Sequence, residues 1–304
     1  MKKLELNEVE KLYDFFKRKA EISFNKRRYN LALKYIQCCA HIAYDISFRF
    51  ADETLDNIIY QIASDILKNP TLDSETNNRN RFVLFDCYPN DNRGLSEQYL
   101  GALMCNQIEF LYIIENYAPD KTKNIIEKIS KYDKADILIL DSENSIIEKA
   151  SVAYKKIVEF QPSKALLHLL PWDVVGCLVF STLTGIERYM IDLTDHAFWL
   201  GINCFDYLIE FRDFGYTIAI NRRNVLKEKI IYLPYYPIFV NSNFVGFPFK
   251  KRMGQTLLLT GGTYYKTFGD NYKFYEVLKK ILENHPSLIV LFVGSGDKKY
   301  IDDF

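Results

Sequence analysis

The chain has 304 residues, 48% of them hydrophobic and 26% charged, with 39 lysines and arginines balanced by 39 aspartates and glutamates. That length suits two domains, and that composition is ordinary for a protein with a large apolar core. The zero net charge excludes the strong positive field of a nucleic-acid-binding protein, so no nucleic-acid partner is expected.

The start of the chain and its most apolar run predict a cytoplasmic protein. The opening sequence MKKLELNEVEKLYDFF has charges where a signal peptide needs an apolar segment. The run ALLHLLPWDVVGCLVF is interrupted by His168, Pro171 and Asp173, so it is too short and too broken to span a bilayer. A substrate at the inner face of the membrane stays compatible with this location. None of the six cysteines forms a CxxC pair, and we expect reduced, buried thiols.

Residues 1–70 are expected to form a helical extension. Apolar residues such as Leu12, Phe15 and Phe16 recur at helical spacing, and no strand-like run occurs before residue 68. The segment YNLALKYIQCCAHIAYD resembles one unit of a helical-hairpin repeat, but repeat folds need about three units to be stable. We therefore expect these helices to pack on the main body, with repeat-mediated protein binding as the alternative.

From Arg81 the pattern changes to apolar runs alternating with amphipathic segments. Strands are expected at 81–86, 109–115, 135–140, 165–169, 187–193, 206–211 and 229–234, and helices at 95–106, 120–132 and 143–159. Unbroken apolar strands alternating with helices indicate a parallel sheet covered on both faces. Residues 81–250 are therefore predicted to form a doubly wound α/β domain, whose ligands gather at the carboxyl ends of its strands.

A second α/β domain is expected at 255–304. After a loop-rich segment come the strand TLLLTGG at 256–262, a helix around 271–284 and the strand SLIVLFVGSGD at 287–297. One βαβ unit leaves its sheet faces exposed and is not stable alone. We therefore expect this domain to be incomplete at Phe304.

Glycines follow three of the expected strands. Gly94, in NDNRGLSEQYL, allows a turn that aims backbone N–H groups above the sheet, although the dinucleotide fingerprint GxGxxG is absent. In LLTGGTYYK, Gly261 and Gly262 precede Lys266, a pattern that favours a backbone cradle for a pyrophosphate with an opposing positive charge. The alternative is a plain loop with a solvated lysine.

The third glycine-rich strand end is FVGSGD, with Gly294 and Gly296. If this strand lies beside 256–262, its glycines line the same crevice as Gly261. Two glycine-rich strand ends converging in one domain favour a phosphate site more strongly than either does alone.

His196, in LTDHAFWLG, follows the strand expected at 187–193. A lone histidine is often a core residue, but the strand ends of a doubly wound sheet are where ligands bind. We therefore predict that His196 is catalytic, with a buried core histidine as the alternative. Asp195 and His196 are adjacent, so we expect their side chains to diverge. We assign His168, Asp173 and Asp195 to acceptor binding, with capping of the helix from 174 as the alternative for Asp173.

The order of these features resembles the glycosyltransferases of the GT-B fold, and most nearly the family 4-type bacterial enzymes that build polysaccharides. In this resemblance Gly94 matches the glycine loop of the first domain, and HLLPWD matches a histidine-containing loop at a strand end. His196 matches the active-site histidine, GGTYYK the segment whose basic residue holds the donor diphosphate, and VGSGD the loop beside the nucleotide. The sequence departs from the family in having Thr263 and two tyrosines between the glycines and Lys266. The family's Glu-rich donor motif would lie beyond Phe304.

The resemblance implies transfer of a sugar from a nucleotide-sugar to a saccharide or lipid-linked acceptor, in polysaccharide biosynthesis. No cofactor is implied besides the donor. No DxD-type acidic pair stands near the expected donor site, so metal dependence is not expected. Peripheral membrane association and a protein partner bound through the helical extension remain compatible. Two alternatives stay open, a non-catalytic GT-B-like partner protein and a nucleotide-sugar epimerase on the same fold.

Overall fold

The computed structural model describes residues 5–67, 80–91, 95–235, 243, 245–247 and 249–297. The chain forms two compact units, Met1–Phe239 and Val240–Phe304. Within the part of the chain that the structure describes, no helix combines the length and the apolar character needed to cross a lipid bilayer.

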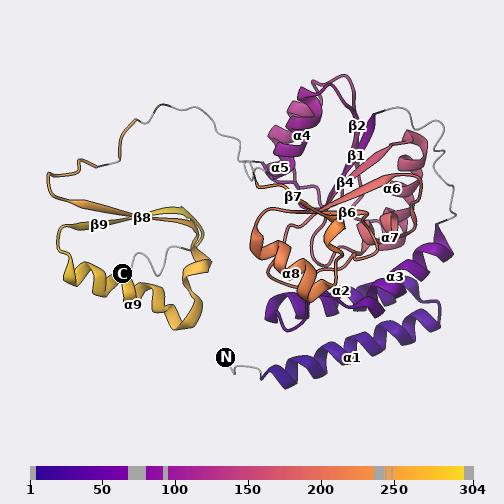
Figure 1. Ribbon diagram of the computed structural model, residues 1–304, viewed down its shortest axis with the longest axis horizontal. Coiled ribbons are helices and arrows are strands. Elements are labelled where there is room, and N and C mark those ends of the chain that lie inside the picture. The colour runs from indigo at the N-terminus through magenta and orange to yellow at the C-terminus, as the bar shows by residue number, and fades with distance from the viewer. Residues whose placement is uncertain are drawn as a thin grey trace. The chain divides into compact units, whose positions relative to one another are not determined.

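The first unit is built on a parallel sheet. Its strands are β1 (Arg81–Asp86), β2 (Glu109–Ile114), β3 (Ala135–Ile139), β4 (Lys164–His168), β5 (Glu187–Ile191), β6 (Tyr207–Glu210) and β7 (Ile230–Tyr232). They lie in the order β3-β2-β1-β4-β5-β6-β7, and every pairing is parallel (Figure 1). The strand order reverses at β1 and β4, which is the switch point of a doubly wound sheet. The predicted α/β fold class is confirmed.

Helices cover the sheet on both faces because its central strands are apolar on both sides. The helices on or beside the sheet are α4 (Leu95–Cys105), α5 (Pro119–Ile129), α6 (Ile146–Phe160), α7 (Val174–Thr182) and α8 (Asp213–Arg223). Leu84 packs with residues of α4 and α5, whereas its neighbours Val83 and Phe85 pack with residues of α6 and α7. Alternate residues of a strand point to opposite faces, so a strand buried on both faces is apolar throughout.

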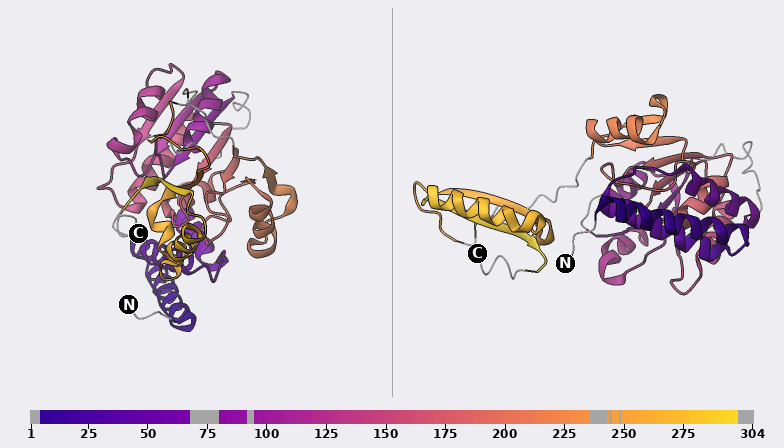
Figure 2. Two further views of the ribbon diagram at one scale, coloured as in Figure 1. Left: turned by 90° about the vertical axis from the view of Figure 1, so that its left-hand side faces the viewer. Right: turned by 90° about the horizontal axis from the view of Figure 1, so that it is seen from below.

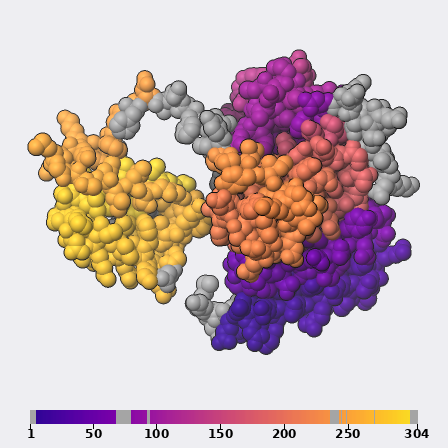
Figure 3. Space-filling model, viewed as in Figure 1, coloured from indigo at the N-terminus to yellow at the C-terminus, as the bar shows by residue number. Residues whose placement is uncertain are grey.

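Three N-terminal helices form a further layer outside α6 and α7. They are α1 (Leu6–Asn25), α2 (Tyr29–Ile46) and α3 (Glu53–Ile66). Figures 1 and 2 show α1 (indigo) as the outermost helix, and Figure 3 shows this layer continuous with the rest of the unit. Asn30 Oδ1 accepts the Ile147 N–H of α6 at 3.2 Å, and apolar residues of α2 and α3 join the core cluster of the sheet. The helices are therefore part of the first compact unit.

The second unit contains a two-stranded parallel sheet. Its elements are β8 (Thr256–Thr263), the 3-10 turn η2 (Tyr264–Thr267), α9 (Gly269–Asn284) and β9 (Leu288–Ser295). The helix crosses between the two strands, as the sequence predicts. Tyr264, Tyr275 and Leu278 are its buried apolar side chains among the described residues, so its core is small.

Two details differ from the sequence-based expectations. The helix expected from 143 begins at Ile146, because Ser145 and Glu148 form a capping box in which each side chain accepts the other's backbone N–H. The expectation of buried thiols is wrong for Cys105, which is exposed at the end of α4.

Candidate functional site

The carboxyl edge of the first sheet holds a buried polar network at its switch point. Asp86 ends β1 and His168 ends β4, and the two residues are partners in the parallel register. His168 Nδ1 lies 2.8 Å from Asp86 Oδ1. Asp86 Oδ2 accepts hydrogen bonds from Ser96 Oγ at 2.6 Å and from Tyr112 OH at 2.8 Å. Three elements around the switch point therefore converge on one carboxylate.

Asp86 stays ionised although it is fully buried. Burial opposes ionisation, but the charge of His168 and the hydrogen bonds from His168, Ser96 and Tyr112 hold the pKa of Asp86 below its usual value. His168 is 3% exposed, and its Nε2 is buried without a hydrogen-bond partner among the described residues. Direct contact of His168 with an acceptor stays a prediction.

A second polar group lies in the loop that follows β5. His196 has a side chain 60% exposed, and its Nδ1 lies 3.4 Å from Asp195 Oδ1. Asp195 also binds the Arg212 guanidinium through two contacts, at 2.5 and 2.8 Å. The expectation that the Asp195 and His196 side chains diverge is therefore wrong. Adjacent side chains diverge along an extended strand, whereas these residues occupy a turn.

Arg223 of α8 holds the backbone of this loop in place. Its guanidinium is buried, lies 3.2 Å from Asp192 Oδ2, and stacks over the Trp199 ring at 4.6 Å. It also donates hydrogen bonds to the carbonyl oxygens of Thr194 and Ala197, at 2.9 and 2.6 Å. These two carbonyls flank Asp195 and His196, so the loop backbone is held while the His196 side chain faces solvent.

A carboxyl pair lies beside Arg223. Glu210 ends β6 and is fully buried, and burial together with the negative charge of Asp192 raises its pKa well above the usual value. Gly215 leaves room for this group, because a Cβ there would overlap Glu210 Oε2. Neither Glu210 oxygen has a conventional donor among the described residues, so we infer that Glu210 is protonated and shares its proton with Asp192.

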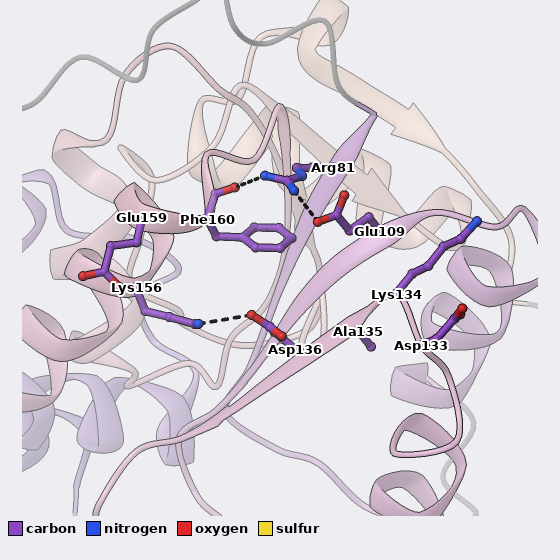
Figure 4. A pocket seen from close by; sticks show the side chains of 9 residues that line it. All are labelled: Arg81, Glu109, Asp133, Lys134, Ala135, Asp136, Lys156, Glu159 and Phe160. Carbon is purple, nitrogen blue, oxygen red and sulfur yellow. Dashed lines mark hydrogen bonds and ion pairs between the residues drawn. The ribbon is translucent and has the colours of Figure 1, made fainter.

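Two cavities mark opposite edges of the same sheet. The cavity at the carboxyl edge has a volume of about 560 Å³ and is lined by residues after β1, β2 and β3, together with Lys121 of α5 and Lys149 of α6. The cavity at the amino edge, of about 360 Å³, is drawn in Figure 4. Its charged side chains mostly bind one another, as in the ion pair Lys156–Asp136 at 3.1 Å. Ligands of doubly wound sheets bind at the carboxyl edge, so the larger cavity is the better candidate.

The glycine-rich strand ends of the second unit lie together, as the sequence predicts. Gly262 of β8 is the register partner of Gly294 of β9, and a Cβ on Gly294 would overlap the Gly262 carbonyl. Gly262 and Gly296 have positive φ, 142° and 128°, which side-chain-bearing residues rarely adopt. Gly261 and Lys266 line a shallow cavity of about 40 Å³ at this edge. Glycine is therefore required by the close backbone approach at Gly294, and is favoured by the positive φ at Gly262 and Gly296.

Two other sequence-based candidates have different outcomes. Gly94 lies outside the described residues. Asp173 Oδ1 accepts the Gly176 N–H at 2.9 Å and caps α7, as the alternative reading predicts. Asp173 also meets Cys87 and Glu115 in a group of potential metal ligands that sequence reasoning missed. Their only common signal was position, because each lies at or beyond the carboxyl end of a strand.

Comparisons with known proteins give distant structural likenesses and no family. No protein-family model matches the chain, and no curated protein matches it. The crystal structure of a proposed UDP-N-acetylglucosamine 2-epimerase from Listeria monocytogenes is similar with a TM-score of 0.44 and 10% sequence identity. The match covers 70% of this chain and 62% of that one. A likeness this distant carries no conclusion about activity.

Proposed function

We propose that this protein is a glycosyltransferase that moves a sugar from a nucleotide-sugar to a hydroxyl group of a saccharide or lipid-linked acceptor. The observation that carries the proposal is the glycine pair at the carboxyl ends of β8 and β9. Backbone N–H groups at such a strand end form a concave site for phosphate oxygens, since no side chain blocks their approach. The donor diphosphate would bind Gly261, Gly262, Gly294 and Gly296.

Lys266 would neutralise the leaving nucleoside diphosphate. It lies in η2, directly after β8, and lines the same shallow cavity as Gly261 and Gly262. When the bond between the anomeric carbon and the phosphate oxygen breaks, the diphosphate leaves with the electron pair. A nearby ammonium group stabilises that developing charge.

His196 would take the proton of the acceptor hydroxyl as its oxygen attacks the anomeric carbon. Its Nδ1 faces Asp195, which favours the tautomer that keeps the proton on Nδ1 and leaves Nε2 as the acceptor. Its side chain is exposed, whereas the loop backbone is fixed by Arg223. A mobile solute can therefore reach a base that is already oriented.

The cavity of about 560 Å³ at the carboxyl edge is our candidate for acceptor binding. Tyr117, 39% exposed, offers a ring face for a sugar, and Asn90, Asn116 and Lys121 offer polar atoms for its hydroxyls. A pocket with one apolar face and several polar groups suits a saccharide.

The test is to incubate the full chain with UDP-, GDP- and TDP-sugars, with and without mono- and oligosaccharide acceptors. We expect acceptor-dependent release of nucleoside diphosphate, together with a gain of one sugar mass by the acceptor. An altered nucleotide-sugar formed without any acceptor would instead identify an epimerase. No thermal stabilisation by any nucleotide-sugar, and no turnover, would leave the non-catalytic partner protein as the explanation.

A further inference from the structure

Three potential metal ligands meet at the carboxyl edge, on the side of the sheet that α6 and α7 cover. Cys87 directly follows β1, Glu115 directly follows β2, and Asp173 is the N-cap residue of α7. One potential ligand atom from each lies within 4.8 Å of the others. The side chains come from three separate elements, so their convergence is a property of the fold.

Two carboxylate oxygens at this point have no conventional hydrogen-bond donor, although the Glu115 and Asp173 carboxyl groups lie within hydrogen-bonding reach of each other. Asp173 is 4% exposed, and while its Oδ1 accepts the Gly176 N–H, its Oδ2 is buried without a partner among the described residues. Glu115 Oε2 is likewise buried without a hydrogen-bond partner among the described residues. A buried carboxylate oxygen without a donor is costly, so it requires a cation or a proton. Gly176 keeps this space open, because a Cβ there would lie 2.7 Å from Asp173 Oδ2.

The sulfur atom is oriented by the backbone. Cys87 Sγ accepts the Leu170 N–H at 2.6 Å and donates to the His168 carbonyl oxygen at 3.3 Å, so two backbone contacts fix the position of the sulfur. Glu115 also lines the carboxyl-edge cavity of about 560 Å³ and is only partly buried. That cavity gives a hydrated ion a route from solvent to the three ligands.

We propose that Cys87, Glu115 and Asp173 bind a divalent cation of the Zn²⁺ or Co²⁺ class. A thiolate beside two carboxylates suits these borderline metals, whereas Mg²⁺ and Ca²⁺ select sites made of oxygen alone. Three protein ligands leave a fourth position of a tetrahedral ion to water. The ion would change three negative charges in a buried place to one. This proposal stands independently of glycosyl transfer.

Cobalt provides the direct test, because a thiolate bound to Co²⁺ gives a charge-transfer band in the near ultraviolet. The full chain, freed of metal with a chelator, is titrated with Co²⁺. We expect the band to saturate at one equivalent and to be displaced by Zn²⁺. Cys87→Ser should abolish it, whereas Cys39→Ser, which alters an equally buried thiol in α2, should leave it unchanged.

Asp173→Asn supplies a second readout that keeps the helix cap. Its amide oxygen can still accept the Gly176 N–H, so the fold is retained and can be checked by circular dichroism. We expect the Co²⁺ affinity to fall by more than about ten-fold, measured by competition with a chromophoric chelator. A wild-type protein without the band, or a band that survives Cys87→Ser, overturns the proposal. Glu115 and Asp173 would then share a proton instead.

Discussion

Two histidines at the ends of neighbouring strands of one sheet have opposite surroundings. His168 ends β4, is 3% exposed, and lies 2.8 Å from the buried carboxylate of Asp86. His196 lies in the loop after β5, with a side chain 60% exposed and 3.4 Å from Asp195. The first is fixed by its own side-chain contacts, whereas the second is placed by contacts of its loop backbone. A position at the end of a strand therefore does not show whether a histidine is buried in a structural network or exposed to a ligand.

Removing the Arg223 side chain, which holds the loop of the exposed His196, should lower the free energy of unfolding more than any other substitution considered below. Arg223→Met takes away a buried guanidinium and leaves the buried charge of the Asp192–Glu210 pair without a cation. We expect the free energy of unfolding to fall by about 3 to 5 kcal/mol, measured by urea denaturation. Arg222→Met, at the exposed neighbouring position, is the matched control and should change it by less than about 1 kcal/mol. Equal effects of the two changes would contradict a buried anchor.

The loop that carries His196 is also held near Gly201, by Asp56, and the pH dependence of stability tests this contact. Asp56 of α3 accepts the Gly201 N–H at 2.7 Å, and burial raises its pKa to about 7. Because the folded state binds this proton more tightly than the unfolded state, stability should fall as pH rises from about 4 to about 7. Asp56→Asn keeps the acceptor oxygen but cannot ionise.

We expect the difference in unfolding free energy between Asp56→Asn and wild type to change by about 3 kcal/mol between pH 4 and pH 8. Urea denaturation at several pH values measures it. Parallel curves for the two proteins would mean that Asp56 does not titrate in this range.

Alanine at each histidine tests the comparison directly. His168→Ala removes a buried partner of Asp86 and should lower the unfolding free energy by about 2 to 3 kcal/mol. His196→Ala should change it by no more than about 0.5 kcal/mol, yet lower kcat by about a hundred-fold. Denaturation and the glycosyl-transfer assay measure the two effects. If His196→Ala unfolds the protein and His168→Ala does not, the assignments are reversed.

Lys266→Ala should have the smallest of these effects. Removing the ammonium group beside Gly261 and Gly262 should raise the donor KM and lower kcat/KM by about ten-fold or more. Lys273→Ala, in the following helix α9, is a control for the loss of a positive charge in this unit. Steady-state kinetics with the active donor compare them, and equal losses would remove the specific role of Lys266.

The sequence by itself determined the order and type of most elements, although it did not predict α8. The run RFVLFD is β1, residue for residue, and its four central residues are apolar because the strand is covered on both faces. The glycines of TLLLTGG and FVGSGD marked two strand ends that would share one crevice if the strands were neighbours, and β8 and β9 are neighbours. Such signals are local, since each depends on residues that are close in the chain.

Only the tertiary structure decided which side chains meet. Arg223 reaches Asp192 across 31 residues, and nothing in LTDHAFWLG indicates that an arginine of α8 holds that loop. Cys87, Glu115 and Asp173 likewise come together only when the sheet and α7 are assembled. The sequence favoured His196 over His168, which stands between Leu167 and Leu169, but only the structure shows that His168 is buried and His196 exposed. Burial and long-range pairing depend on how the elements pack, which no short stretch of sequence contains.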